Sequence, residues 1–161
     1  KNLKIAKQQW KESKMKAKNL KLLAKTKEDI RVVSAYLQDA IVNVSDLANL
    51  KKNKIFLMQL NRFMWEDVEK GVFRKNKRIR TILKFENVIK VHAKNINQSK
   101  GDKFLDFLAI ETNQMIDNNY EMKIVFAGDS ILKIIAEVIE VTLDDQGKAW
   151  DTKNIPKHKS I

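Results

Sequence analysis

Cysteine is absent from the chain and glycine is rare, and the two shortages exclude several kinds of site. Without cysteine, the 161 residues can form no disulfide, no thiolate metal site and no cysteine nucleophile, as is typical of a reducing cytoplasm. The four glycines are scattered, so no glycine-rich loop is available to bind phosphates. No serine lies in a Gly-x-Ser-x-Gly turn either.

Long hydrophobic runs are also missing. The longest, residues 130–143, is interrupted by Lys133, Glu137 and Glu140 and is shorter than the ~18 residues that span a membrane. The N-terminal residues do not show an apolar segment followed by a small-residue cleavage site, which is the pattern of a secretory signal. We therefore expect a cytoplasmic protein that does not bind membranes.

Histidines are few, and the sequence contains no recognisable set of catalytic residues. The two histidines, His92 and His158, do not have metal-ligand spacing on one element. The carboxylates are dispersed along the chain and identify no acid–base pair. We expect no metal and no cofactor, and we favour a non-catalytic function over an enzymatic one.

The basic charge of the chain is distributed unevenly. Residues 1–27 contain ten lysines and one acidic residue, Glu12, which gives +9 of the total +12 and leaves +3 for the rest. Lysine outnumbers arginine 27 to 5, a bias that indicates solvated lysines more than a polyanion partner. In such a chain an arginine marks a site that needs a planar guanidinium group, and four of the five lie at positions 62, 74, 78 and 80.

The first predicted elements are a short strand and a helix. Residues 19–24 read as a strand, and Thr26 with Asp29 forms a capping-box pattern that starts a helix over residues 27–42. One helix face carries Ile30, Val33, Leu37, Ala40 and Ile41 at helical spacing. Val32, Ala35 and Val42 make a second apolar face, so we expect a second cover from the N-terminal arm, the C-terminal tail or another subunit.

The remainder of the chain predicts one strand after another. Strands are expected at residues 46–50, 55–60, 104–112 and 120–126, with a charged loop over residues 65–77. Residues 55–60 are apolar on both faces, which predicts a central strand. Residues 130–144 fit a strand with a bulge near Glu137, and a helix from Ala136 is the alternative.

Residues 78–94 predict a hairpin that turns at residues 86–88. The first strand places basic residues on one face and apolar residues on the other, and the second strand does the same. If the strands pair, one basic face collects Arg78, Arg80, Lys84, Lys90, His92 and Lys94.

The fold class that follows is α+β. We expect a mainly antiparallel, strongly bent sheet or partly closed β-barrel of about seven or eight strands with one N-terminal helix. A pleckstrin-homology-like barrel is one topology, by analogy only. The expected organisation is a basic arm at residues 1–18, a single domain at residues 19–150 and a polar tail at residues 151–161.

A group of polar and aromatic residues gathers where the helix, the central strand and the hairpin should meet. It consists of Gln38, Asp39, Asn61, Arg62, Trp65, Glu66, Arg78 and Arg80. The favoured interpretation is a buried network in which a forked arginine pairs with a carboxylate, and we expect Asp39 to pair with Arg62 or Arg80. The alternative is an anion or partner-protein site with Trp65 as an aromatic anchor.

Several of these motifs resemble a bacterial family. The matching stretches include Leu20-Lys-Leu-Leu, Leu60-Asn-Arg-Phe followed by Trp65-Glu66, Phe107-Leu-Ala-Ile and Ala149-Trp150. In order and spacing they are similar to an alphaproteobacterial family known as domain of unknown function 2948, over about residues 20–158. The resemblance implies a small cytoplasmic bacterial protein, and it implies no activity, substrate or cofactor.

The expected function is therefore a non-catalytic binding or accessory role through a protein partner. The alternative is binding of RNA or another polyanion by the basic hairpin and the lysine-rich arm.

Overall fold

The computed structural model of the protein describes residues 19–68, 76–97, 103–153 and 155–156. Nine strands dominate these residues, and all neighbouring strands are antiparallel. The strands are β1 Lys21–Ala24, β2 Ile41–Leu50, β3 Ile55–Phe63, β4 Lys77–Phe85, β5 Val88–Lys94, β6 Phe104–Gln114, β7 Tyr120–Phe126, β8 Ile131–Ala136 and β9 Val141–Asp151. The helical elements are α2 Lys27–Leu37, the 3-10 turn η1 Lys51–Asn53 and α3 Trp65–Val68.

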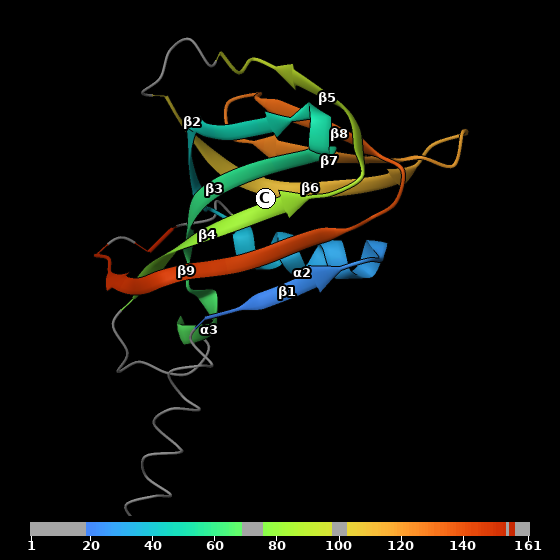
Figure 1. Cartoon of the computed structure of the whole chain (residues 1–161). Helices are drawn as coiled ribbons and strands as arrows, with labels where there is room; N and C mark the ends of the chain where they lie inside the picture. Colours follow the sequence, from blue (N-terminus) through green and yellow to red (C-terminus); the bar gives the residue numbers. More distant parts are fainter. Residues whose placement is uncertain (1–18, 69–75, 98–102, 154, 157–161) are drawn as a thin grey trace, which may run out of the picture.

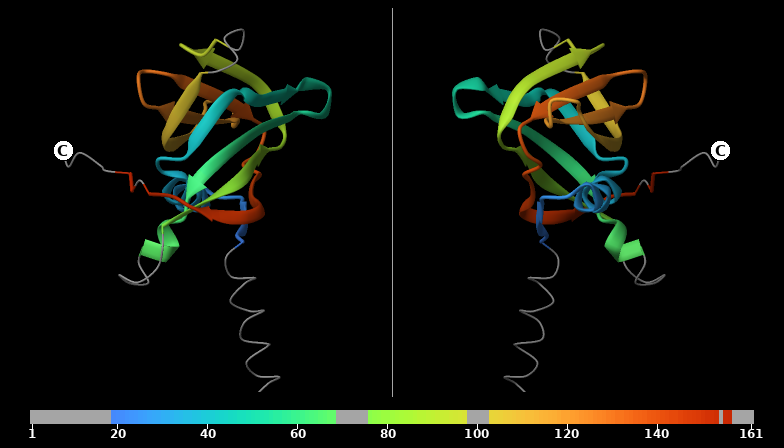
Figure 2. Two further views of the ribbon diagram at one scale, coloured as in Figure 1. Left: turned by 90° about the vertical axis from the view of Figure 1, so that its left-hand side faces the viewer. Right: turned by 90° about the vertical axis from the view of Figure 1, so that its right-hand side faces the viewer.

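The sheet is strongly bent, because β6 belongs to both of its halves. Residues 104–106 of β6 pair with β2, and from Phe107 onward β6 pairs with β7. The strand order is β1-β9-β4-β3-β2-β6-β7-β8-β5, and within the described residues its two edge strands do not pair with each other. The sheet is therefore curved around one core without being closed, as the views in Figures 1 and 2 show.

Helix α2 covers the open side of this curved sheet and packs against β1, β3 and β6 (Figure 1). Its start confirms the predicted capping box: the Thr26 hydroxyl accepts from the Asp29 N–H at 3.1 Å, and the Asp29 carboxylate accepts from the Thr26 N–H at 3.2 Å. Ile30 and Val33 are buried against the sheet, whereas Val32 on the outer face is 51% exposed. The second apolar face of α2 thus lies on the surface of the described part.

The helix is shorter than predicted. It ends at Leu37 and not at residue 42, because Asp39 takes the left-handed conformation with φ of 62° and the chain turns there into β2. The Asp39 N–H donates to the Phe107 carbonyl at 2.8 Å. Ile41 and Val42 then pair with both β3 and β6, an arrangement that suits β-branched side chains and outweighs their helical spacing.

The predicted hairpin of residues 78–94 is wrong. β4 lies between β3 and β9, and β5 pairs with β8 in the other half of the sheet. Asn87, with φ of 57°, redirects the chain between the two strands. The Glu86 N–H donates to the backbone carbonyl of Glu140, which is not part of β5, so no hairpin turn closes here. The single basic face therefore does not form: Arg78, Arg80 and Lys84 belong to β4, while Lys90, His92 and Lys94 belong to β5.

Other strand predictions hold in part. Residues 130–144 are extended, as the favoured interpretation had it, but they form two strands, β8 and β9, in different halves of the sheet and not one bulged strand. The bent antiparallel sheet with an N-terminal helix is confirmed, with nine strands instead of seven or eight. The pleckstrin-homology-like topology and the three-part division of the chain stay predictions, and the arm at residues 1–18 lies outside the described residues.

Candidate functional site

The side chain of Arg62 lies at the centre of the predicted polar group. Alternation along β3 turns Phe56, Met58, Leu60 and Arg62 toward the core, and the Arg62 side chain is fully buried. The Asp145 carboxylate on β9 accepts two hydrogen bonds from Arg62, from Nε to Oδ1 at 2.8 Å and from Nη2 to Oδ2 at 2.6 Å. This is the bidentate geometry that makes an arginine–carboxylate pair strong.

Asp145 is held by three residues outside its own strand. Besides Arg62 of β3, the Thr81 hydroxyl of β4 donates to Oδ1 at 2.6 Å, and the Leu20 N–H just before β1 donates to Oδ2 at 2.8 Å. Each carboxylate oxygen of Asp145 thus accepts two hydrogen bonds. A buried charge needs such complete pairing, because its desolvation is costly.

Glu66 completes the surroundings of the guanidinium group from α3. Arg62 donates to it from Nη1 at 3.0 Å and from Nη2 at 2.8 Å, and the Tyr36 ring lies 5.7 Å from the Arg62 Cζ. Burial by itself lowers the pKa of Arg62, but hydrogen bonds to Asp145 and Glu66 and their charges outweigh it and raise the pKa above its ordinary value. Arg62 therefore stays charged, with two carboxylates already bound, and cannot offer its fork to an anionic ligand.

Trp65 is the aromatic member of the group, and its position is defined on two sides. Its Nε1–H donates to the carbonyl of Gln38, the residue that caps the end of α2, at 2.9 Å. Its ring meets Phe63 edge-on with centroids 4.6 Å apart. The indole is thus positioned between the end of α2 and the end of β3.

Arg78 donates to backbone carbonyls. Its Nη1 donates to the carbonyls of Asn61 at 3.1 Å and Asp39 at 3.3 Å, and its Cζ lies 5.8 Å from the Phe63 ring centroid. Burial lowers the pKa of Arg78, and the charges of Asp39 and Asp106 oppose that shift. Arg78 thereby joins the turn after α2 to the end of β3.

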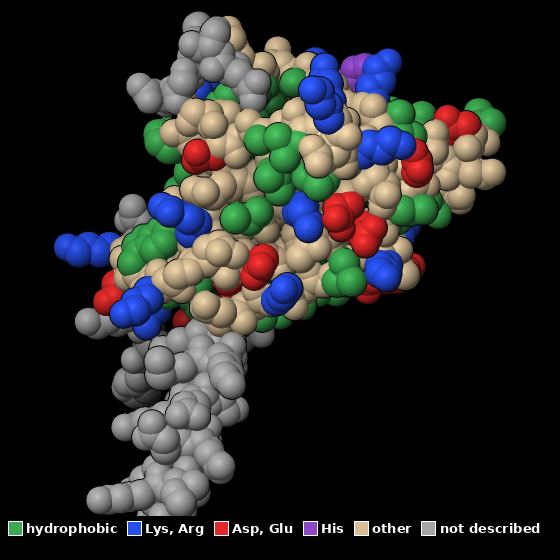
Figure 3. Space-filling view, viewed as in Figure 1, with side chains coloured by type: hydrophobic (Ala, Val, Ile, Leu, Met, Phe, Trp, Pro, Cys, Tyr) green, Lys and Arg blue, Asp and Glu red, His purple; other side chains and the backbone are tan. Residues whose placement is uncertain are grey.

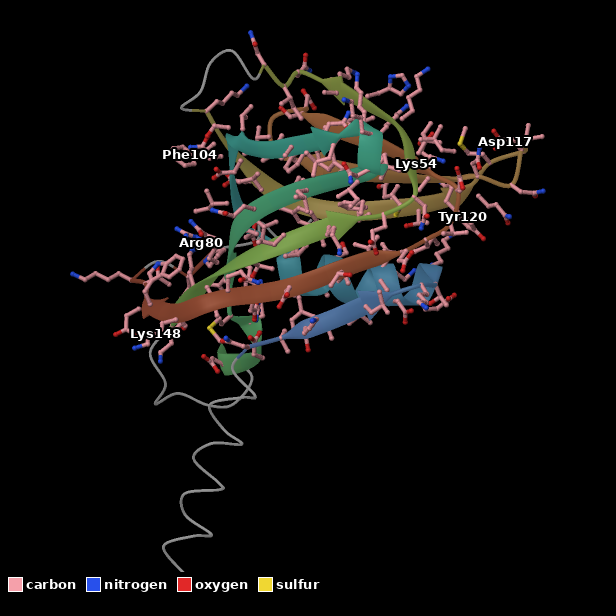
Figure 4. All side chains as sticks on the ribbon, viewed as in Figure 1. Lys54, Arg80, Phe104, Asp117, Tyr120 and Lys148 are labelled. Carbon is pink, nitrogen blue, oxygen red and sulfur yellow. The ribbon has the colours of Figure 1, made fainter. Side chains whose placement is uncertain are left out.

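The structure therefore brings most of the predicted group together but changes the pairs. The predicted pairing of Asp39 with Arg62 or Arg80 is wrong: Arg62 binds Asp145 and Glu66, and Asp39 instead lies near the charge of Arg78. Arg80 is exposed and projects at the end of the sheet that also carries Lys148, as Figure 4 shows. It takes no part in the buried network.

Two members of the network were missed from the sequence, Asp145 and Thr81. Asp145 had a signal, because it continues the inward parity of Val141 and Leu143 and so places a carboxylate in a core-facing row. Thr81 likewise stands between the inward residues Ile79 and Leu83. A polar residue at a core-facing position of a strand requires a hydrogen-bond partner, and this rule could have identified both residues from the sequence.

A groove opens on the surface beside the buried network. It has a volume of about 410 Å³ and lies between α2 and α3. We call it the α2–α3 groove; its lining residues are Arg31, Val32, Ala35, Tyr36, Trp65 and Glu66. Tyr36 and Glu66 both also contact Arg62, so one wall of the groove is built on the buried ion pairs.

Two negative findings apply to the described residues. None of their helices is long and apolar enough to cross a membrane. No group of three or more His, Asp or Glu side chains among them is placed to hold a metal ion.

Comparison with known proteins identifies a family and nothing closer. Neither the curated proteins nor the solved structures yielded a match. A family model described as "Protein of unknown function (DUF2948)" matches residues 20–158, which include every described strand, the buried Arg62 network and the α2–α3 groove. The chain therefore belongs to the DUF2948 family.

Proposed function

We propose that the protein is a non-catalytic binding module that recognises a partner protein through the α2–α3 groove. The observation that carries this proposal is the second apolar face of α2: Val32 is 51% exposed and Ala35 is exposed, although the helix already buries its other face against the sheet. An exposed apolar surface next to ordered aromatic side chains is typical of a protein contact site.

The residues around the groove suit an apolar anchor side chain of a partner. Tyr36 and Trp65 supply aromatic surface, and the Trp65 indole is held by its hydrogen bond to Gln38. Arg31 and Glu66 supply charge at the margin, and the Glu66 carboxylate is held by Arg62. Side chains that are already ordered lose little entropy on binding, which favours affinity.

Site-specific photo-cross-linking tests the proposal. A photoreactive residue at position 35 should cross-link to a single partner protein in a one-to-one ratio. Treatment with nuclease should not reduce this cross-linking. With that partner purified, Val32→Glu should weaken binding about tenfold or more, because a charge enters an apolar contact. The matched control is Val138→Glu, at a residue of similar exposure (48%) outside the groove, which should bind normally.

Two outcomes would contradict this function. Cross-links from position 35 that lead only to residues 1–18 of the same chain would assign the groove to the chain's own arm. Equal loss of partner binding in Val32→Glu and Val138→Glu would show that the groove is not the contact surface.

A second candidate function is binding of RNA or another polyanion. One observation favours it: the register of β5 and β8 puts Lys90, His92 and Lys94 beside Lys133 on one outer face. Phosphate contacts release counterions, so RNA affinity should fall steeply with salt, and Lys133→Glu should weaken it. Affinity that does not depend on salt would reject this candidate.

A further inference from the structure

We propose that the free edge of β5 binds an extended, acidic segment of a partner protein, which pairs with β5 as an additional strand. No residue of this edge lines the α2–α3 groove, and the proposal does not rest on the proposed function. The mode is β-strand addition, in which main-chain hydrogen bonds supply affinity and alternate side chains supply specificity.

The first observation is that β5 is an open edge. It pairs with β8 along one side and is the last strand in the sheet order. On its other side, the Val88 N–H donates to the Lys54 carbonyl at 2.9 Å, and beyond that no described residue forms a hydrogen bond with residues 89–94 across this edge. Such an edge presents unpaired N–H and C=O groups that can receive another strand.

The second observation is a cavity under this edge. It has a volume of about 230 Å³ and lies between β5 and the β2–β3 hairpin. Its lining residues are Leu47, Asn49, Phe56, Val91, Ala93, Ile96, Asn97 and Leu132. Ala93 lines this cavity and is nevertheless exposed, so the opening reaches the surface at a small side chain. An apolar side chain of an added strand can enter there.

The third observation is a row of basic side chains on the opposite face of β5. Lys90, His92 and Lys94 alternate with Val91 and Ala93, and Lys133 of β8 lies directly beside His92. The single described histidine and neighbouring cationic side chains are visible together at the top of Figure 3. Elsewhere on this outer face Lys123 is paired with Glu111 at 3.3 Å, whereas no described acid pairs with Lys90, Lys94 or Lys133.

These observations together define the guest segment. In an antiparallel or parallel addition, guest side chains beside Val91 and Ala93 point toward the cavity, and those beside Lys90, His92 and Lys94 point outward. The complementary segment therefore alternates apolar and acidic residues. A second copy of β5 does not fit, because it would place the Lys90 and Lys94 side chains of the two copies close to each other.

Nucleic acid satisfies only part of this surface. Phosphates would bind the lysines, but a nucleic-acid backbone offers no alternating donors and acceptors for the strand edge. It also offers no aliphatic side chain for the cavity. The geometry of β5 thus favours a protein segment, and RNA serves as a comparison probe in the test.

The test uses three probes and the full chain. They are a short peptide that alternates valine and glutamate, a peptide of the same composition with the alternation scrambled, and a single-stranded RNA. Calorimetry should show about tenfold tighter binding of the alternating peptide than of the scrambled one. Hydrogen exchange should slow at those β5 amides that face away from β8.

Two variants separate charge from shape. Lys90→Glu with Lys94→Glu should weaken binding of the alternating peptide about tenfold or more. The control, Lys148→Glu with Lys153→Glu, makes the same charge change at exposed residues elsewhere and should leave peptide binding unchanged. Ala93→Leu narrows the opening of the cavity. It should weaken binding of the alternating peptide and leave any RNA binding unchanged. Thermal unfolding of each variant establishes that the fold is retained.

Three results would overturn the proposal. Equal binding of alternating and scrambled peptides would show simple charge attraction without strand pairing. Binding of RNA but not of the peptide would assign the face to nucleic acid. Binding of no probe, with aggregation after Lys90→Glu and Lys94→Glu, would show that the lysines serve only to protect the edge from self-association.

Discussion

Asp145 and Arg62 are 83 positions apart in the sequence and meet in the core through hydrogen bonds of 2.8 and 2.6 Å. Their pairing joins β9 to β3, two strands that are separated by β4 in the sheet. Glu66 adds α3 to the same guanidinium group. One buried arginine thereby connects the sheet to the helical wall of the α2–α3 groove.

The first prediction concerns this buried charge. Arg62→Ala should lower the free energy of unfolding by about 3–5 kcal/mol, because it leaves the fully buried Asp145 carboxylate without a counter-charge. Arg80→Ala, at an exposed arginine of the neighbouring strand, should change it by less than about 0.5 kcal/mol. Urea denaturation of both variants measures the difference. Equal, small effects would show that Asp145 reaches water or another cation when Arg62 is removed.

The second prediction concerns Thr112 on β6. Its Oγ1 is buried and has no hydrogen-bond partner among the described residues. Thr112→Val removes this unsatisfied hydroxyl at nearly constant volume and should raise the free energy of unfolding by about 1 kcal/mol. Thr81→Val is the contrasting variant, because the Thr81 hydroxyl donates to Asp145 at 2.6 Å, and it should instead be destabilised. Destabilisation by Thr112→Val would indicate a bound water at that hydroxyl.

The third prediction concerns the start of α2. Hydrogen bonds from the Lys25 and Thr26 N–H groups hold the pKa of Asp29 below its ordinary value of 3.8. Because the folded-state pKa is lowered, the contribution of Asp29 to stability is complete above pH 3.8 and is lost as the pH falls through the lowered pKa. The stability difference between the wild-type protein and Asp29→Asn should therefore be constant near neutral pH and shrink in acid. Thermal unfolding over a pH series measures it, and a difference that grows in acid would contradict the capping role.

The fourth prediction concerns the basic arm. Deleting residues 1–18 should leave the melting temperature nearly unchanged, because the residues from Ala24 to Leu143 already form a continuous buried core within the described part of the chain. Deleting residues 1–22 is the control: it removes the Leu20 contacts with Asp145 and half of β1, and it should lower the melting temperature clearly. Similar losses in both deletions would show that the arm is an integral part of the domain.

Local chemistry determined much of this protein from the sequence by itself. The Thr26 capping box, the two-sided apolar pattern of β3 and the alternation of residues 130–144 correctly indicated a helix start and strands. The few arginines in a lysine-rich chain directed attention to Arg62 and Arg78, which form hydrogen bonds inside the protein, but equally to Arg80, which is exposed. The ordered motifs between positions 20 and 158 also identified the family. All of these are signals carried by residues close together in the chain.

Only the tertiary structure decided which strands are neighbours and which charges pair. Alternation gives a strand its two faces but does not name its partner, so β4 and β5 looked like a hairpin until Asn87 sent them to different halves of the sheet. For the same reason we expected Asp39 to pair with Arg62, whereas Arg62 pairs with Asp145. Strand pairing and buried ion pairs depend on the burial and hydrogen bonding of residues far apart in the chain, and these energies are defined only when the sheet has assembled.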